Sequence, residues 1–390
     1  MQKVVKFLTG ILLLGFTVFP AHATFSSLYV FGDCISTTTN NTSGLPYYYG
    51  QRYANGRVWI EVLAQRQGLT YDPNKNWSYF YNSSTTMLAN VSSFQAPSDA
   101  SNSLFVIWVN NADLWFLAKY SGTTMSAWTS SINQSQNNHY KAVTNLYAKG
   151  VRTLVLPNAV DVSTIPAFNA SANANFIHLR CLDYNIAFSN TLNRIKASCP
   201  NLMLYTPDFF TLLANMLAHP ASYGLTNTLG SNGKSIDAVD AMNYGFPSAA
   251  INGFGTNLIF WDPQDPTAMV HAWMANLTQQ LISPARISQI TLLNGIVQLD
   301  LANVPIGQNG FVLGCTNLAV LNWLTPTNWT TNASFNSIST TQSVFVLDSD
   351  RSQNRRFSPN DSGPFPTNTT LSEYTWQLYR LSFPYGWTWP

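Results

Sequence analysis

The run Tyr29-Val30-Phe31-Gly32-Asp33-Cys34-Ile35-Ser36 decides the fold class of this chain. Its apolar start predicts a short buried strand, and the Gly-Asp pair predicts a tight turn where that strand ends. Hydrolytic α/β folds use this layout because it places a reactive side chain at the carboxyl edge of a parallel sheet. The side chain presented here is the thiol of Cys34, which is a strong nucleophile only as the thiolate.

From residue 27 to about residue 283, apolar runs alternate with helical patterns, which is typical of βαβ units. We therefore expect a parallel sheet covered by helices. The expected strands are residues 28–31, 104–109, 153–156, 202–205 and 258–261, and the expected helices are residues 58–67, 127–149, 173–196 and 266–281. Residues 71–103 are rich in Asn, Ser and Tyr, and we expect them to form a long helix-free loop that covers a site.

The pattern changes after Ser283 and Pro284, because the helical period disappears. Short apolar runs separated by Asn, Pro and Gly turns predict a small all-β module, similar to a β-sandwich. The expected strands are residues 287–293, 296–301, 310–313, 319–323, 343–346 and 376–383. The chain thus divides into residues 1–23, an α/β domain over 24–283 and a β-module over 284–390.

Residues 1–23 have the layout of a signal peptide. Lys3 and Lys6 precede an apolar stretch over residues 7–19, and Ala21-His22-Ala23 forms a cleavage site before Thr24. A membrane anchor is the alternative, but the apolar stretch is too short to span a bilayer. Removing this segment leaves 17 basic and 17 acidic residues. We expect a secreted protein without a nucleic-acid partner, since a neutral chain has no electrostatic footprint for phosphate backbones.

The cysteines and histidines give no sign of a metal or a cofactor. Four cysteines and four histidines remain after residue 23, and they are scattered without the spacing of metal ligands. Cys181 and Cys199 bracket one predicted helix, which would hold them about 27 Å apart and prevent a disulfide between them. The sequence also has no phosphate-binding glycine loop.

Two motifs resemble the GDSL (SGNH) hydrolase family. Residues 31–36, Phe-Gly-Asp-Cys-Ile-Ser, are similar to the family's Phe-Gly-Asp-Ser-Leu-Ser, with Cys34 in place of the nucleophilic serine. Residues 53–64, Tyr-Ala-Asn-Gly-Arg-Val-Trp-Ile-Glu-Val-Leu-Ala, are similar to the family's Ser-Asn-Gly-Arg-Val-Trp run, which implies that the Gly56 N–H binds the oxyanion. The resemblance covers about residues 25–283. It implies a three-layer α/β/α sandwich that hydrolyses esters of lipids, aryl alcohols or acetylated sugars without a metal.

A third motif departs from the family pattern Trp-x-Gly-x-Asn-Asp. Residues 108–113 read Trp-Val-Asn-Asn-Ala-Asp, so Ala112 stands where the family has the asparagine that holds the oxyanion. Losing one such donor typically lowers the rate by about 10²–10³. Asn111 is the nearest side chain that can replace the donor, if the turn is reshaped.

The last motif, Asp-x-x-His-Pro-Thr in the family, keeps Asp262 but has Asp265 at the position of the catalytic histidine. An unperturbed aspartate is about six orders of magnitude too weak a base at neutral pH to hold the proton of a serine. A purely structural role is also open to Asp265, because an acidic residue before Pro266 is a favourable helix start.

Three interpretations therefore stay open. The first is an ester hydrolase in which Cys34 attacks, His271 acts as base with Asp262 orienting it, and the N–H groups of Gly56 and Cys34 hold the oxyanion. His271 lies six residues past the motif position, about 9 Å further along a helix. The second is a catalytically degenerate protein, with an inert cysteine in place of the lost serine, that binds a glycan or lipid in the old cleft. The third is a structural surface protein.

Overall fold

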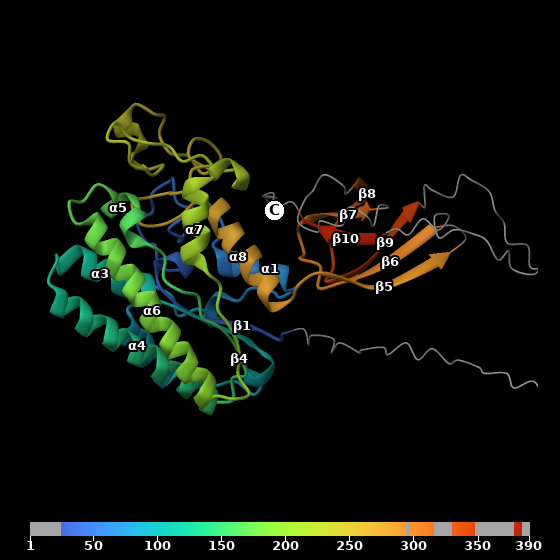
Figure 1. Ribbon diagram of the computed structural model, residues 1–390, viewed down its shortest axis with the longest axis horizontal. Coiled ribbons are helices and arrows are strands. Elements are labelled where there is room, and N and C mark those ends of the chain that lie inside the picture. Colours follow the sequence, from blue (N-terminus) through green and yellow to red (C-terminus); the bar gives the residue numbers. More distant parts are fainter. Residues whose placement is uncertain (1–24, 294–295, 316–329, 348–377, 384–390) are drawn as a thin grey trace, which may run out of the picture.

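A parallel sheet forms the centre of the α/β part of the protein. The computed structural model describes residues 25–293, 296–315, 330–347 and 378–383 (Figure 1). Its sheet has the order β1-β2-β3-β4, formed by β1 (Leu28–Gly32), β2 (Leu104–Trp108), β3 (Thr153–Val155) and β4 (Met203–Tyr205). All residues of β1 and β2 are buried, which requires cover on both faces of the sheet.

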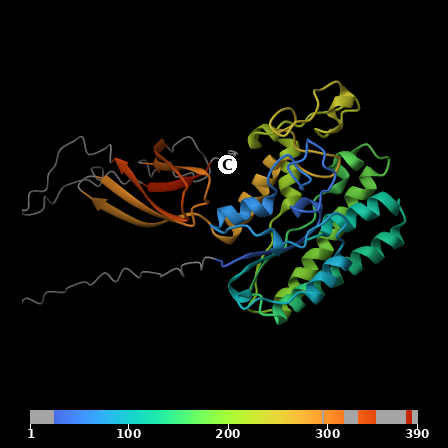
Figure 2. The same cartoon turned by 180° about the vertical axis from the view of Figure 1, so that it is seen from behind.

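Two helix layers supply this cover. The helices α2, α3, α4 and α6 lie on one side of the sheet, and α1, α7 and α8 lie on the other (Figures 1 and 2). The predicted three-layer α/β/α fold is thus confirmed. The helices are α1 (Trp59–Arg66), α2 (Ser84–Ser93), α3 (Asn110–Tyr120), α4 (Met125–Ala148), α5 (Pro166–Asn169), α6 (Ala174–Ser198), α7 (Phe209–Ala218) and α8 (Ala268–Ile282).

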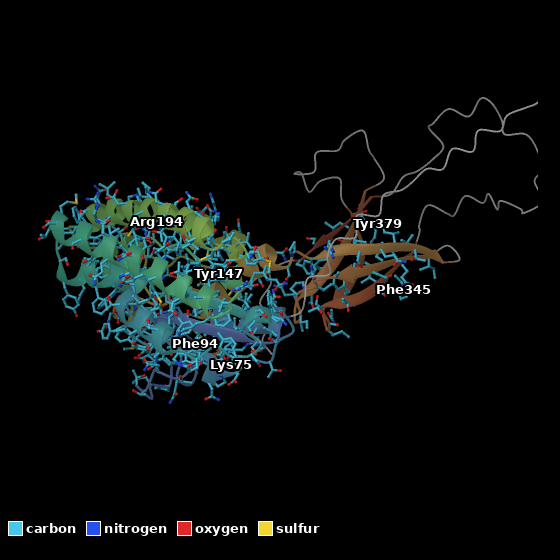
Figure 3. The ribbon with its side chains drawn as sticks, turned by 90° about the horizontal axis from the view of Figure 1, so that it is seen from below. Lys75, Phe94, Tyr147, Arg194, Phe345 and Tyr379 are labelled. Atoms are coloured by element: carbon cyan, nitrogen blue, oxygen red, sulfur yellow. The ribbon has the colours of Figure 1, made fainter. Side chains whose placement is uncertain are left out.

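Aromatic rings pack against the first strand and connect it to its surroundings. The rings of Tyr29 and Phe31 contact Phe94 edge to face, with centroids 5.7 and 5.5 Å apart. The ammonium group of Lys75 lies 5.1 Å from the centroid of the Tyr29 ring, and Figure 3 shows Lys75 and Phe94 close together beside this strand. This packing holds β1 in place, and Cys34 lies just past the end of that strand.

The expectation of a helix-free loop over residues 71–103 is wrong, because this segment contains α2. The Ser83 side chain caps the helix by accepting a hydrogen bond from the Thr86 N–H. Met87 and Val91, four residues apart, are buried. The other positions of α2 are mostly Ser, Thr and Asn, so the sequence shows little apolar contrast around the helix. The helices α3 and α7 were not predicted either.

The expected strand over residues 258–261 is also wrong. Leu258 and Phe260 form only isolated bridges, to Thr226 and Pro266, and the segment does not join the sheet. It is nevertheless buried, and its backbone accepts hydrogen bonds from Ala238 and Val239. An apolar run thus predicted burial correctly and strand pairing incorrectly.

The residues after α8 that the structure describes form only β-strands and connecting turns, as the sequence predicts. Two antiparallel three-stranded sheets have the orders β5-β6-β9 and β10-β7-β8, and Leu299, Val312 and Val346 are buried in a small core between them. Their strands are β5 (Arg286–Leu293), β6 (Ile296–Ala302), β7 (Asn309–Cys315), β8 (Thr330–Asn336), β9 (Thr341–Leu347) and β10 (Leu378–Ser382). Strand β8 was not predicted, and the strand expected over residues 319–323 lies outside the described residues.

Two further expectations concern the ends and the cysteines. The signal segment over residues 1–23 lies outside the described residues. Among the helices that the structure describes, none combines the length and the apolar character needed to cross a bilayer. Cys34, Cys181 and Cys199 are free thiols, and Cys181 lies in α6, whose C-cap is Cys199.

Candidate active site

The turn after β1 presents Cys34 at the carboxyl end of the sheet. The Asp33 N–H donates to the Trp108 carbonyl at the end of β2, and Asp33 Oδ1 accepts from the Ile35 N–H at 3.1 Å. This cap starts a single 3₁₀ turn, Cys34–Ser36. A side chain at Gly32 would meet Ser36 at 2.6 Å, so the tight turn requires glycine here.

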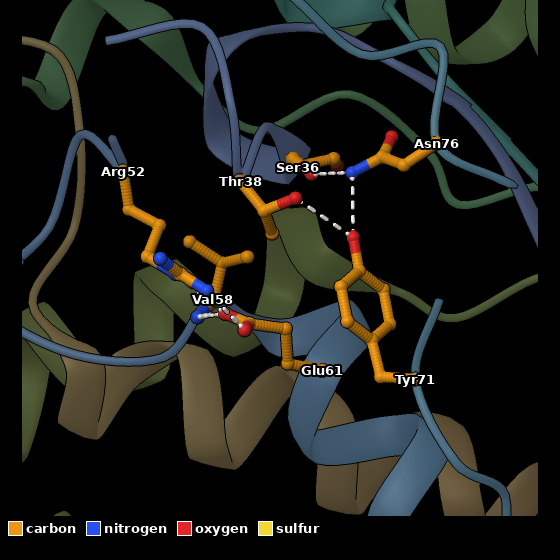
Figure 4. A network of polar contacts seen from close by, with 7 residues as sticks. All are labelled: Ser36, Thr38, Arg52, Val58, Glu61, Tyr71 and Asn76. Atoms are coloured by element: carbon orange, nitrogen blue, oxygen red, sulfur yellow. Dashed lines mark hydrogen bonds and ion pairs between the residues drawn. The ribbon is translucent and has the colours of Figure 1, made fainter. Parts of the chain in front are cut away.

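A polar network fixes the loop that follows Cys34 (Figure 4). Asn76 Nδ2 donates to the Ser36 carbonyl at 2.8 Å and to Tyr71 Oη at 3.0 Å, and Tyr71 Oη also bonds Thr38 Oγ1 at 2.9 Å. Next to it, Glu61 of α1 pairs with Arg52. The nucleophile turn and the start of α1 are thus held by charges and hydroxyls rather than by apolar packing alone.

A small cavity of about 40 Å³ opens beside Cys34. This volume has room for a few waters or a short acyl group. The acidic and amide side chains in its wall come from the ends of β1 and β2 and from the segment before α8, and most other wall residues are aromatic or aliphatic. The lining residues are Asp33, Cys34, Ile35, Phe80, Tyr81, Asn111, Ala112, Trp115, Phe116, Val160, Val162, Ile165 and Gln264.

Asp265 lies beside the thiol of Cys34, and after burial it is the largest cause that raises the pKa of that thiol. The structure gives Asp265 no capping role, since α8 begins at Ala268 with Thr267 as its N-cap. The carboxyl is almost fully buried, and its Oδ1 has no hydrogen-bond partner among the described residues. The group next to the candidate nucleophile is therefore a carboxyl.

Asp262 is the carboxyl of the pair that accepts more hydrogen bonds. Its Oδ1 accepts from the N–H groups of Gln264 and Asp265, at 2.9 and 2.8 Å, and its Oδ2 accepts from Tyr48 Oη at 2.7 Å. Burial raises the pKa of Asp262, and these three donors offset part of that rise. Burial and the neighbouring Asp262 raise the pKa of Asp265 well above its usual value, so Asp265 is the carboxyl that more readily holds a proton.

The same acidic surroundings keep the Cys34 thiol protonated. Burial is the largest cause that raises its pKa well above the ordinary value, followed by the carboxyls of Asp265 and Asp33. Burial also raises the pKa of Asp33 to about 7. A reactive thiolate needs a cation, a helix N-terminus or an imidazole beside it, and Cys34 has carboxyls instead.

Asn111 reaches the cavity. Its Oδ1 accepts a hydrogen bond from the Val160 N–H at 3.0 Å. This bond orients the amide, so the Nδ2 group points away from Val160. Nδ2 is buried and has no hydrogen-bond partner among the described residues. Asn111 is 6% exposed and lines the same cavity as Cys34. An unpaired buried donor at this place is suited to bind a ligand carbonyl.

The structure brings Cys34, Asp262 and Asn111 to one region and places His271 elsewhere. Nδ1 of His271 accepts a hydrogen bond from the Trp59 backbone N–H at 3.2 Å, between α8 and α1. Burial lowers the pKa of this histidine to about 3, so its ring is neutral. His271 is not among the residues that line the described cavity beside Cys34.

Gly56 is buried just before α1 and does not line that described cavity. Its neighbour Asn55 accepts a hydrogen bond from the Ala268 N–H at 2.8 Å, so this motif joins the start of α1 to the start of α8. An oxyanion role for Gly56 stays a prediction.

Sequence reasoning missed Tyr48 and the aromatic wall of the cavity. Tyr48 belongs to the run Tyr47-Tyr48-Tyr49, which carried no motif, and it contacts Asp262 more than 200 positions later in the chain. The density of aromatic residues between 47 and 81 was the available signal. No group of three or more His, Cys, Asp or Glu side chains within the described residues is arranged to hold a metal ion.

A known family matches the α/β part of the chain. The model of the GDSL-like lipase/acylhydrolase family matches residues 28–278. Among solved structures, the chain is similar to a catalytic mutant of an acetylxylan esterase from Geobacillus stearothermophilus, at 12% identity over 65% of this chain and 92% of that chain, with a TM-score of 0.37. It is also similar to an α/β hydrolase from the metagenome of Lake Arreo, Spain, at 14% identity over 67% and 98%, with a TM-score of 0.38. A search of curated proteins gave no match.

Proposed function

Because this chain belongs to the GDSL-like lipase/acylhydrolase family, we propose that it uses the family's ester site to bind an acylated ligand without hydrolysing it. The observation that supports this function is the position of the buried Asp265 carboxyl beside the Cys34 thiol. Burial and their mutual proximity raise the pKa of both groups, so both hold their protons at neutral pH. A nucleophile without a base to accept its proton does not attack an ester at a useful rate.

Binding of an acyl group remains chemically reasonable at this site. The cavity has room for a short acyl chain, and its apolar wall includes Ile35, Val160 and Ile165. The unpaired Nδ2 of Asn111 offers a hydrogen bond to the ester carbonyl. A protonated Cys34 thiol is a weak donor to the same group. The site thus keeps carbonyl recognition and lacks proton abstraction.

Ester hydrolysis is the second candidate, and one observation favours it. Burial raises the pKa of Asp265, and a carboxylate with a raised pKa is a stronger base than an ordinary one. In this scheme ionised Asp265 takes the Sγ proton, and Sγ forms a thioester while the C–O bond to the alcohol breaks. Asp265 returns the proton to the alcohol, and water then hydrolyses the thioester. The scheme requires both carboxyls of the pair to be ionised, which their proximity disfavours.

Two measurements on the same samples decide between the candidates. Hydrolysis of p-nitrophenyl acetate is measured for the wild type and for Cys34→Ala, and binding of phenyl acetate is followed by ligand-observed NMR. We expect equal background hydrolysis in both proteins, and binding that Asn111→Leu weakens. Turnover that Cys34→Ala abolishes would overturn the binding-only function and establish the hydrolase. Absence of both turnover and binding would exclude both candidates.

We also propose that the protein is exported after removal of residues 1–23. The supporting observation is the basic, apolar and Ala-His-Ala order of this segment. N-terminal sequencing of protein recovered outside the cytoplasm is expected to begin at Thr24. A mature chain that still begins at Met1 would contradict export by cleavage.

A further inference from the structure

We propose that the ligand is an acylated polysaccharide, whose sugar chain lies along two arms of aromatic side chains that meet at Phe80 in the wall of the Cys34 cavity. The inference rests on the proposed function, since it places the acyl group in that cavity. It goes further by naming the carrier of the ester. A pyranose ring has apolar C–H faces and hydroxyl edges, so it binds where aromatic faces and small polar groups alternate.

The first arm begins beside the carboxyl pair. The rings of Tyr47 and Tyr48 have centroids 4.8 Å apart, Tyr48 and Tyr53 are 5.9 Å apart, and Tyr53 and Phe80 are 5.3 Å apart. All four side chains are half-buried, so each ring keeps part of its surface accessible. The hydrogen bond from Tyr48 to Asp262 fixes this arm next to the site.

The second arm continues from the cavity wall toward α3. Tyr81 lies with its ring centroid 3.9 Å from Phe80 and 5.2 Å from Phe116, and Phe116 lies 6.1 Å from Tyr120. Tyr81 is 46% exposed and Tyr120 is 68% exposed. A soluble protein seldom exposes a connected row of aromatic rings unless the row contacts a ligand.

The backbone at Tyr81 supports a ligand role for this arm. Tyr81 has φ of +66°, a left-handed conformation that is unusual for a bulky residue. Strain of this kind is found most often at binding and active sites. The strained residue packs its ring against Phe80 and Phe116 and still leaves it 46% exposed, so the conformation holds a large aromatic face at the surface.

A polar cavity lies at the far end of the second arm. It encloses about 350 Å³, which is within the range of about 300–1,000 Å³ for small-molecule sites. Phe116 lines both this cavity and the one beside Cys34, so the two are neighbours. Hydroxyl and amide groups dominate its wall, which includes Ser83, Thr85, Ser121, Ser131 and Gln134, with Tyr120 at the edge. These groups can form hydrogen bonds with the hydroxyls of a sugar ring, whereas a lipid tail has no donor or acceptor to pair with them.

The charge of the protein also favours a neutral ligand. The chain contains 19 basic and 17 acidic residues in 390, so it has few charges with which to hold anionic lipid headgroups. Most of the described residues that line the polar cavity are Ser, Thr, Gln or Tyr, and none of them is Lys or Arg, unlike a membrane-binding surface. A polysaccharide is therefore the polymer that the observations favour.

Calorimetry with the full chain tests the proposal. The ligands are soluble xylo-, cello- and chito-oligosaccharides, each with and without O-acetyl groups. We expect at least one hexasaccharide to bind and Tyr120→Ala to weaken it roughly three- to tenfold, as expected for the loss of one stacked ring. Tyr147→Ala is the matched control. Tyr147 lies on α4 as do Ser131 and Ser135, but about 18 Å beyond Ser135 along the helix, so binding is expected to be unchanged.

Tyr81→Gly separates recognition from folding. Glycine relieves the left-handed backbone while it removes the ring, so we expect weaker sugar binding at equal or higher thermal stability. Sugar binding that is unchanged when Ala112→Trp fills the Cys34 cavity would leave sugar recognition by the two arms intact, but it would overturn both the proposed acyl binding and the placement of the acyl group in this inference. Binding of phenyl acetate without binding of any oligosaccharide would keep the proposed function and overturn this inference. Binding to phosphatidylcholine vesicles in place of sugars would overturn it as well.

Discussion

The carboxyl of Asp265 lies beside the thiol of Cys34, and after burial it is the largest cause that raises the pKa of that thiol. An imidazole gains charge as it removes a proton from a nucleophile, whereas a buried carboxyl beside Asp262 resists losing its own proton. The proposed binding function follows from this difference, because the pair lacks a group that readily accepts the thiol proton.

Asp33→Asn is expected to make Cys34 more reactive at pH 8. Burial raises the pKa of Asp33 to about 7, so its carboxyl is mostly ionised at this pH, and its charge is one of the causes that raise the pKa of the Cys34 thiol. The amide keeps an oxygen for the hydrogen bond from the Ile35 N–H. One pKa unit corresponds to about a tenfold change in the thiolate fraction. Alkylation of Cys34 by iodoacetamide at pH 8, measured by mass spectrometry, is expected to be roughly tenfold faster than in the wild type. Asp183→Asn, which changes a surface carboxyl on α6, is the control, and equal rates in all three proteins would contradict the prediction.

The free energy of unfolding is expected to fall as the pH rises from about 4 to about 7. Burial raises the pKa of Asp237 from 3.8 to about 7, so the folded state binds a proton more tightly than the unfolded state does. The resulting stabilisation is complete below about pH 4 and is lost as the pH passes 7. A shift of about three units corresponds to up to about 4 kcal/mol.

Asp237→Asn tests this origin of the pH dependence. Its amide keeps an oxygen for the hydrogen bond from the Asp240 N–H, at 2.8 Å in the wild type, and cannot ionise. The variant is expected to be more stable than the wild type at pH 8 and to lose less stability between pH 4 and pH 8. Urea denaturation at both values provides the measurement, and parallel curves for variant and wild type would argue against a buried Asp237.

His271→Ala is expected to destabilise the fold and leave the chemistry of Cys34 unchanged. The ring is buried and accepts the Trp59 N–H, so its loss leaves a void and an unpaired donor, worth about 2–4 kcal/mol. The alkylation rate of Cys34 in the folded variant should equal that of the wild type. His219→Ala removes an exposed ring and controls for the loss of a histidine. A slower alkylation in His271→Ala alone would restore this histidine as a base.

Most of the fold follows from residues whose signal is local. Strands β1 and β2 are apolar throughout, and α1, α4, α6 and α8 show a helical period long enough to recognise. By contrast, α2 is built mostly of Ser, Thr and Asn around Met87 and Val91, so its helical character depends on a cap and on packing against α4. Residues 258–261 are buried by the segment around Ala238. No local sequence pattern distinguishes a buried irregular segment of this kind from a buried strand.

In the candidate site, too, the residues with a local sequence signal were predicted and the long-range contacts were not. Cys34, Asp262 and Asn111 were found because motifs tie them to neighbouring sequence. The partner of Cys34 was not found, because Asp265 reads equally well as a helix cap until the carboxyl is seen against the thiol. The hydrogen bond from Tyr48 to Asp262 joins residues far apart in the chain, and such contacts carry no local signal.

Restoring the family residues is expected to create an esterase. Cys34→Ser with Asp265→His replaces two proton-holding groups with a hydroxyl and a base, and Asp262 then lies where it can orient the imidazole. Adding Ala112→Asn supplies a further oxyanion donor, which should raise the rate of p-nitrophenyl acetate hydrolysis by about 10²–10³ over the double variant. Asp265→His alone is expected to hydrolyse the ester more slowly than the triple variant, because Ala112 still leaves the oxyanion without this donor. A matched triple variant that carries Cys34→Ala in place of Cys34→Ser must show none of the new activity. A triple variant that folds, binds phenyl acetate and shows no turnover would mean that Asp265 does not occupy the position of the base.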